Sequence, residues 1–430
     1  MQVLTPAGSR IPPILICGIL IVLLFTGDVR GEIAFKRSDK VLVLAPHPDD
    51  EAIGTFGVIK NAKDAGAEVR VVCLTNGDNN EIAFLIYKKH PVLSAKGLIA
   101  MGETRRKETL SAMAGMGLDP KDVIFLGYPD FGTLAIFTGS WGDTKPYEAM
   151  LTKQTKVPYP EAMSYGAPYT GDSILKDLEN ILEEFRPTVI FVSHPADSNV
   201  DHKAFYLFLR VALWDLDGSL EAPSVHPYIV HVQGWPAPKG YHPGLVLKPS
   251  VKFKQVSWGT LDLAREEVEA KHAAISKYKS QLAYDPGYLY SFARRNELFG
   301  DYAPLRIKDN GRSGIYGIRG GNLTVNLSLA GKTDIDRDFT VYLIGYKKGR
   351  DFSDMPKLHI RIDAGGLHCR DGHERLYSKE VTADFGPGAI MLKVPLSLLE
   401  DPEHIFACVE GRTENMSNDD TRWRVLERQH

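Results

Sequence analysis

One short polar run, Ala-Pro-His-Pro-Asp-Asp-Glu at residues 45–51, constrains this chain more than any other feature. It follows an apolar run at residues 41–44, which is typical of a strand buried in a parallel sheet. The residues after it, 52–66, carry apolar side chains at helical spacing. The sequence therefore predicts that an imidazole and several carboxylates lie at the carboxyl end of a strand, where open α/β sheets place their binding sites.

A second run of the same kind, Ser-His-Pro-Ala-Asp-Ser-Asn-Val-Asp-His, occupies residues 193–202. It also follows an apolar strand pattern, at residues 188–192, and a helical pattern begins near Lys203. Two His/Asp clusters at two strand ends are able to converge on one ion. Imidazole and carboxylate suit a borderline divalent metal such as zinc, and a further carboxylate beside the metal would take a proton from water.

The rest of the chain predicts an α/β unit followed by a β unit. Between residues 32 and 300, short apolar runs alternate with helical patterns, which indicates a Rossmann-like, mainly parallel sheet. No G-x-G-x-x-G follows the first strand, so the dinucleotide fingerprint is absent. From residue 301 to residue 430, short strand patterns separated by Gly, Asp and Pro predict a β-sandwich accessory domain. The expected strands are 41–45, 69–75, 123–127, 188–193, 228–233, and then 315–318, 323–329, 339–346, 358–362, 389–395 and 404–409; the expected helices are 51–65, 103–116, 173–185, 202–214 and 261–281.

The first 31 residues have the features of an export signal. Residues 11–25 are nearly all apolar and follow Arg10, which suits a signal-peptide core, and an uncleaved membrane anchor is the alternative. We therefore expect an exported protein that is periplasmic, on the cell surface or secreted. Cys369 and Cys408 would be free to form a disulfide in such a compartment, but sequence alone leaves their distance open.

Charge excludes one class of partner. The chain of 430 residues has a formal net charge of −3 and no Lys/Arg run, so nucleic-acid binding is a poor interpretation. An irregular segment at residues 131–171 is rich in aromatic side chains. It is either a loop that stacks on sugar rings or an insertion that packs on the sheet.

The two polar runs together resemble the signature of the PIG-L/LmbE-like superfamily of metal-dependent N-acetylglucosaminyl deacetylases, in the bacterial branch with A-P-H-P-D-D-E and H-P-x-D-x-N-x-D-H motifs. The resemblance covers residues 38–300. It implies that His47, Asp50 and His202 hold Zn²⁺, although iron or cobalt would fit the same ligands. It also implies that Asp49 is the general base.

Other matches and one departure concern the substrate. Many members of the family have a histidine at the position of Asn199, where it assists the oxyanion, so Asn199 and His194 are the catalytic candidates for that role here. The stretches around Arg105 and Asp130 resemble family segments that contact the sugar, which makes these two residues substrate-binding candidates. His231 lies in the apolar run 229–232 and is interpreted as a core histidine.

The resemblance implies a zinc-dependent hydrolase that removes N-acetyl groups from N-acetylglucosamine-type sugars, in an envelope or extracellular glycan. Two alternatives remain open. One is an amidase that acts on another N-acyl or peptide-like substrate, and the other is a carbohydrate-binding protein that has kept a metal site without catalysis.

Overall fold

The computed structural model describes residues 33–88, 93–328, 338–363, 365–372, 376, 379–386, 388–411 and 422–429. The predicted signal peptide or anchor at residues 1–31 lies outside this part of the chain. Within the described residues, no helix has both the length and the apolar character needed to span a membrane.

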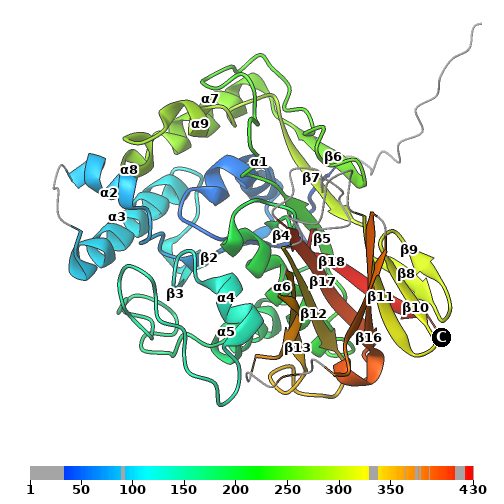
Figure 1. Cartoon of the computed structure of the whole chain (residues 1–430). Helices are drawn as coiled ribbons and strands as arrows, with labels where there is room; N and C mark the ends of the chain where they lie inside the picture. Colours follow the sequence, from blue (N-terminus) through cyan, green and yellow to red (C-terminus); the bar gives the residue numbers. More distant parts are fainter. Residues whose placement is uncertain are drawn as a thin grey trace, which may run out of the picture.

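The first unit is built on a sheet of seven strands in the order β3-β2-β1-β4-β5-β7-β6. The first five strands in this order pair in parallel, and β7 runs antiparallel to both β5 and β6. The mainly parallel α/β sheet predicted from the sequence is therefore confirmed (Figure 1). The strands are β1 (Lys40–Ala45), β2 (Glu68–Thr75), β3 (Val123–Tyr128), β4 (Val189–Ser193), β5 (Ser224–Tyr228), β6 (Val256–Asp262) and β7 (Asn296–Tyr302).

The order of the strands places the two polar runs side by side. Strand β1 pairs with β2 on one side and with β4 on the other, and Leu44 is opposite Val192. The order therefore reverses direction at β1 and β4, and such a switch point is where open α/β sheets form their binding crevice. The loops after β1 and β4 carry the two polar runs, so they meet at one edge of the sheet.

Helices cover both faces of this sheet because each strand has apolar side chains on both faces. Leu42 and Leu44 of β1 pack in one core cluster with residues of α5 and α6, whereas Val41 and Val43 pack in another with residues of α1 and α7. The helices are α1 (Asp50–Asp64), α2 (Glu81–Lys88), α3 (Ala95–Ala114), α4 (Thr133–Gly139), α5 (Gly171–Phe185), α6 (Val200–Asp215), α7 (Arg265–Ile275), α8 (Lys279–Leu282) and α9 (Pro286–Tyr290), with a 3₁₀ turn at Pro120–Asp122.

Two sequence predictions in this unit were wrong. The expected strand 228–233 ends at its first residue, since β5 is Ser224–Tyr228. The expected helix 261–281 is divided, because Val256–Asp262 forms an edge strand and the helical segments α7 and α8 follow it. In the first case the apolar run 229–232 lies beyond the end of the strand, and in the second the beginning of the expected helix is a strand.

The β unit consists of two packed sheets, drawn in yellow to red in Figure 1. Their facing side chains form a separate core cluster, which includes Leu323, Leu343 and Leu392. This arrangement is the predicted β-sandwich. One sheet has the order β15-β16-β11-β10-β9 and the other β14-β13-β12-β17-β18-β8. The strands are β8 (Leu305–Lys308), β9 (Arg312–Ser313), β10 (Tyr316–Arg319), β11 (Asn322–Ser328), β12 (Phe339–Tyr346), β13 (Lys357–Asp363), β14 (Gly366–Arg370), β15 (Thr382–Gly386), β16 (Ala389–Pro395), β17 (His404–Gly411) and β18 (Arg424–Gln429), with a 3₁₀ turn at Leu396–Leu399.

The two cysteines of the sandwich are both buried, and neither is part of a disulfide. Cys369 lies on β14 and Cys408 on β17, and two strands of the same sheet separate them. Neighbouring strands are about 4.8 Å apart, so the two Cα atoms are far beyond the roughly 7 Å limit for a disulfide.

The burial of aromatic side chains at residues 131–171 favours the alternative in which this segment packs on the sheet. Trp141, Tyr159 and Tyr169 are buried and belong to the core cluster under α5 and α6. Tyr165 is exposed. Most of the large rings therefore fill the interior of the molecule and are not presented to a ligand.

Candidate metal centre

The side chains of the two loops converge at the edge of the sheet. His47 Nδ1 and His202 Nε2 lie 3.2 and 3.0 Å from the same oxygen, Oδ2 of Asp50. These three atoms form a group with the spacing of metal ligands. Zinc binds nitrogen and oxygen at about 2.0–2.2 Å, so tetrahedral ligands are roughly 3.3 Å apart, and the observed separations suit such a site.

The hydrogen-bond partners of His202 and Asp50 indicate whether a cation fits between these side chains. His202 is fully buried, yet neither of its ring nitrogens makes a hydrogen bond within the described chain, although each faces a carboxylate. Oδ1 of Asp50 is also buried and has no hydrogen-bond partner there. Buried polar atoms normally have partners, and a metal ion bound by Nε2 of His202 and the carboxylate of Asp50 would provide one, while Nδ1 of His202 faces Asp197.

Two other groups of three residues overlap the first one, namely His47 with Asp130 and Asp201, and Asp197 with His202 and His231. In these groups Asp201 and Asp197 are already engaged by several hydrogen-bond donors. Asp201 accepts hydrogen bonds from the backbone of Phe131 and from both the backbone and the hydroxyl of Thr133, and Asp197 accepts from the backbone of Asn199, Val230 and His231. Asp50 and Asp130 each accept one backbone hydrogen bond on Oδ2 and have no partner for Oδ1 within the described chain. The motif resemblance, which assigns His47, Asp50 and His202, therefore decides between the groups.

A carboxylate faces the second nitrogen of each proposed ligand histidine. Nε2 of His47 lies 3.1 Å from Oδ2 of Asp201 and 3.1 Å from Oδ1 of Asp130, and Nδ1 of His202 lies 3.3 Å from Oδ2 of Asp197. Such partners fix the orientation of the ring and increase its basicity toward a metal.

The electrostatics of the cluster attract positive charge. Burial opposes the charged form of His202, but Asp197 and Asp50 outweigh it and raise the pKa of His202 to about 9. The pKa of Asp50 is lowered, despite its burial, by His202 and His47. The carboxylates of the cluster therefore favour positive charge at this point, which suits a metal cation that takes the place of the histidine proton.

Asp49 lies beside the ligands in a strained backbone conformation. Its φ of 130° is in the region that side chains other than glycine rarely adopt, and it precedes the first turn of α1. Its backbone N–H donates to Oε2 of Glu51 at 3.0 Å, and Glu51 also accepts a short hydrogen bond from the Tyr278 hydroxyl. Burial raises the pKa of Asp49 to about 8, against the attraction of Arg105. Strain of this kind costs about 1–3 kcal/mol and persists only where the surroundings impose it.

Arg105 stabilises the loop after β1, which carries the first polar run. Its guanidinium donates to the carbonyl of Pro48 at 2.8 Å, to the carbonyl of Gly77 at 3.0 Å and to Oδ2 of Asp49 at 3.3 Å. Only 4% of Arg105 is exposed. Glu108, three residues further along α3, accepts hydrogen bonds from the backbone N–H and the hydroxyl of Ser280.

The other predicted site residues have distinct positions. Asp130 is buried and lies against His47, and its Oδ2 accepts a hydrogen bond from the backbone of Asn79. Oδ1 of Asn199 caps α6 by accepting from the backbone N–H of Asp201 at 2.8 Å. His194 is fully buried in a box of aromatic rings formed by Phe253, Trp258 and Tyr302, and burial lowers its pKa to about 3.

His231 is the site residue that the sequence interpretation missed. Its ring packs edge-on against His202 with 4.6 Å between the ring centroids, and its Nδ1 lies 3.3 Å from Oδ1 of Asp197. Its side chain is 34% exposed, whereas that of His202 is fully buried. The sequence interpretation placed His231 inside an expected strand at residues 228–233, where it would be a core residue. Because β5 ends at Tyr228, His231 lies beyond the carboxyl end of the strand, next to β4, where a ligand-facing residue belongs.

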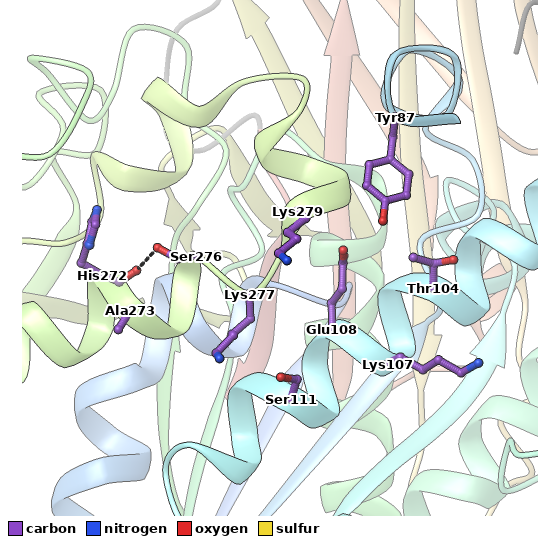
Figure 2. A pocket seen from close by; sticks show the side chains of 10 residues that line it. All are labelled: Tyr87, Thr104, Lys107, Glu108, Ser111, His272, Ala273, Ser276, Lys277 and Lys279. Atoms are coloured by element: carbon purple, nitrogen blue, oxygen red, sulfur yellow. Dashed lines mark hydrogen bonds between the residues drawn. The ribbon is translucent and has the colours of Figure 1, made fainter. Parts of the chain in front are cut away.

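A separate hollow of about 730 Å³ lies between α3 and the segment that contains α7 and α8 (Figure 2). Its lining includes Lys107, Glu108, His272 and Lys277, and none of the residues of the metal cluster. The hollow is therefore distinct from the candidate centre.

Comparisons with known proteins agree with the family inferred from the motifs. Residues 42–213 match the family model described as PIG-L, GlcNAc-PI de-N-acetylase. A stretch of 164 residues is 29% identical to the 1D-myo-inositol 2-acetamido-2-deoxy-alpha-D-glucopyranoside deacetylase of Mycobacterium sp. (strain KMS), over 38% of this chain and 45% of that protein. A stretch of 168 residues is 30% identical to deacetylase 1 of the same description from Saccharopolyspora erythraea, over 38% of this chain and 48% of that protein. The chain thus spans about half the length of these curated relatives.

Among solved structures, the N,N'-diacetylchitobiose deacetylase from Pyrococcus horikoshii has 21% sequence identity and a TM-score of 0.39, over 61% of this chain and 83% of that one. The family match covers both polar runs, all three proposed ligands, β4 and all but the first two residues of β1. Residues 42–213 of the α/β unit therefore match the PIG-L family model.

Proposed function

We propose that this protein is a zinc-dependent N-deacetylase that acts on N-acetylglucosamine-type amino sugars. The observation that carries the proposal is the convergence of His47, Asp50 and His202 beside the carboxylate of Asp49, at the switch point of the sheet. The match of residues 42–213 to the GlcNAc-PI de-N-acetylase family model supports the reaction class, and the curated relatives named as deacetylases of an N-acetylated glucopyranoside support the sugar.

The metal and Asp49 contribute different steps of amide hydrolysis. When bound, zinc supplies Lewis acidity, which activates water and polarises a carbonyl. Asp49 accepts the proton that the attacking water loses as its oxygen bonds to the acetyl carbon. Asp49 then delivers this proton to the amine nitrogen as the C–N bond breaks, so that acetate and a free amine leave.

The exposure of the side chains at the centre indicates which of them contacts the substrate. His231 presents a partly exposed imidazole beside His202, while Asp197 holds the opposite side of the ring. We assign His231 to contact the scissile acetamido group. Asn199, His194, Arg105 and Asp130 remain predictions for oxyanion and sugar contacts.

The proposal includes an exported setting, which rests on the apolar run at residues 11–25. The expected substrate is accordingly a glycan of the envelope or of the extracellular space. Fractionation of cells that produce the full chain tests this part, and recovery of the chain only with cytosolic markers would contradict it.

Acetate release by the purified full chain tests the reaction. N-acetylglucosamine, N,N'-diacetylchitobiose and longer oligomers are supplied before chelation, after chelation and after return of Zn²⁺. We expect release that disappears with the chelator and returns with zinc. Release that persists unchanged after complete removal of the metal would contradict a metal-dependent mechanism, and absence of release from every acetylated sugar would contradict the proposed substrate class.

A further inference from the structure

Helix α6 connects the metal centre to the C-terminal β-sandwich. Its first turn carries Asp201 and the proposed ligand His202. At its other end, Trp214 stacks on His404 with ring centroids 4.3 Å apart, and it packs against Phe406 at 5.1 Å. One core cluster contains residues of α6 together with residues of β12, β17 and β18, which Figure 1 shows beside the helix. The sandwich therefore packs directly on the helix that carries the ligand.

The sandwich also reaches the loop in front of α6. Nη1 of Arg422, two residues before β18, donates a hydrogen bond of 2.8 Å to the carbonyl of Ala196. The guanidinium lies over the ring of Phe253, 5.1 Å from its centroid. Only 1% of Ala196 is exposed, so this carbonyl has little access to water. Loss of its charged donor would leave a buried acceptor without a partner.

The residue after Ala196 is Asp197, the carboxylate that organises this half of the centre. Its Oδ2 accepts hydrogen bonds from the backbone of Val230 at 2.9 Å and of His231 at 2.8 Å, and lies 3.3 Å from Nδ1 of His202. The peptide unit whose carbonyl Arg422 holds is the one that joins Ala196 to Asp197. A rotation of that peptide would therefore move the carboxylate that orients both histidines.

We propose that Arg422 is a positioning residue of the metal centre, which acts on His202 through the Ala196–Asp197 peptide. The C-terminal β-sandwich is thereby a structural part of the site, although it lies outside the family match at residues 42–213. The inference shares with the proposed function the assumption that His47, Asp50 and His202 bind a divalent metal. It does not depend on the substrate or on turnover.

Arg424 offers a matched control. It lies two residues further along, over the ring of Tyr302 at 4.2 Å, and its hydrogen bonds go to Oε1 of Gln255 and to the carbonyl of Ala303. These two partners lie outside the loop of residues 193–199, so Arg424 joins the same two units at a different point.

The test compares the Zn²⁺ affinity of the full chain and of its Arg422→Ala, Arg422→Lys and Arg424→Ala variants, by competition with a chromophoric chelator. Loss of a residue that orients a metal ligand typically costs about 10–100-fold in metal affinity, and we expect a loss of this order for Arg422→Ala. Arg422→Lys keeps a donor for the carbonyl and is expected to recover part of the affinity. Arg424→Ala is expected to lower the thermal midpoint while its Zn²⁺ affinity stays within about twofold of the original.

Three outcomes would overturn the inference. They are unchanged affinity in a folded Arg422→Ala variant, an equal loss of affinity in Arg424→Ala, and a full chain that binds no Zn²⁺. If Arg422→Ala does not fold, the test rests on Arg422→Lys. A measurable loss of Zn²⁺ affinity in Arg422→Lys, with unchanged affinity in Arg424→Ala, would support the inference. No loss of affinity in Arg422→Lys would refute it. Zn²⁺ binding without acetate release would refute the proposed function and leave this test intact.

Discussion

The loop after β1 and the loop after β4 each supply part of one metal centre, but different parts of the chain hold them. The first loop is held from within the α/β unit, where Arg105 donates to the carbonyl of Pro48 and Glu51 accepts from the backbone N–H of Asp49. The second loop is held partly by Arg422, which belongs to the β-sandwich. A site that one family motif describes therefore depends, in this protein, on a domain that the motif does not include.

Catalysis is expected to depend most strongly on the first loop. The change Asp49→Asn removes the proposed base but preserves the size of the side chain. General acid–base catalysis typically contributes 10²–10⁴-fold, so we expect kcat to fall by about this factor while zinc content stays at the original value. Steady-state acetate release and metal analysis measure the two quantities.

Asp64→Asn is the control for this change, since Asp64 is the last residue of the same helix and its side chain is 58% exposed. Full activity in Asp49→Asn would show that another group serves as the base.

Glu297 contacts α1, the helix that follows the first loop. Among the changes around this loop, Glu297→Ala is expected to cause the largest loss in the free energy of unfolding. Glu297 pairs with the fully buried Lys271 at 2.7 Å and accepts a hydrogen bond from the backbone of Gly57 in α1. This backbone needs the acceptor because α1 is interrupted at Thr55. Removal of one partner of a buried pair costs about 3–5 kcal/mol, because the other charge stays buried without compensation.

Urea unfolding measures this cost. The double change Lys271→Met with Glu297→Leu removes both charges and should restore much of the stability. A loss below about 1 kcal/mol in Glu297→Ala would contradict the structural role of the pair.

Tyr278→Phe is expected to have a smaller effect on the same loop. It deletes the hydroxyl that donates to the buried carboxylate of Glu51, and hydrogen bonds to charged groups contribute about 1.5–3 kcal/mol. Tyr290→Phe is the control, because its hydroxyl is paired with the hydroxyl of Ser276, a neutral partner. If the two variants unfold at the same urea concentration, the contact between Tyr278 and Glu51 does not support the loop as described.

The smallest expected effect concerns the junction between α6 and the sandwich. Burial and the neighbouring Asp215, Glu183 and Asp351 raise the pKa of Glu179 to about 7. The folded protein therefore binds this proton more tightly than the unfolded chain does. Stability from this group is complete at low pH and declines as the pH rises from about 4.5 toward 7.

The thermal midpoint of the full chain should therefore fall over this pH range by more than that of Glu179→Gln. Identical pH profiles of the two proteins would exclude Glu179 as the cause.

The sequence predicted the centre of the fold well because short-range signals determine it. The apolar runs 41–45 and 190–193 are buried on both faces, and the polar runs that follow them lie at the sheet edge. The sequence could not assign β6 and β7 to the first sheet, since their antiparallel pairing joins segments far apart in the chain and leaves no local pattern.

The residues missed at the site have the same explanation. His231 was interpreted as a core residue because an error of a few residues in a strand end changes which side chains face the ligand. Arg422 gave no signal, because its contact with Ala196 spans 226 positions of the chain. Motifs indicate the candidate ligands, and only the tertiary structure shows which residues hold them in place.

The most direct test of the account is the position of zinc in crystals of the full chain, located by anomalous scattering at the zinc edge. The account predicts one strong peak within about 2.0–2.2 Å of Nδ1 of His47, Oδ2 of Asp50 and Nε2 of His202. A peak between Asp197, His202 and His231, or one at His47, Asp130 and Asp201, would contradict the proposed ligand set and the roles derived from it.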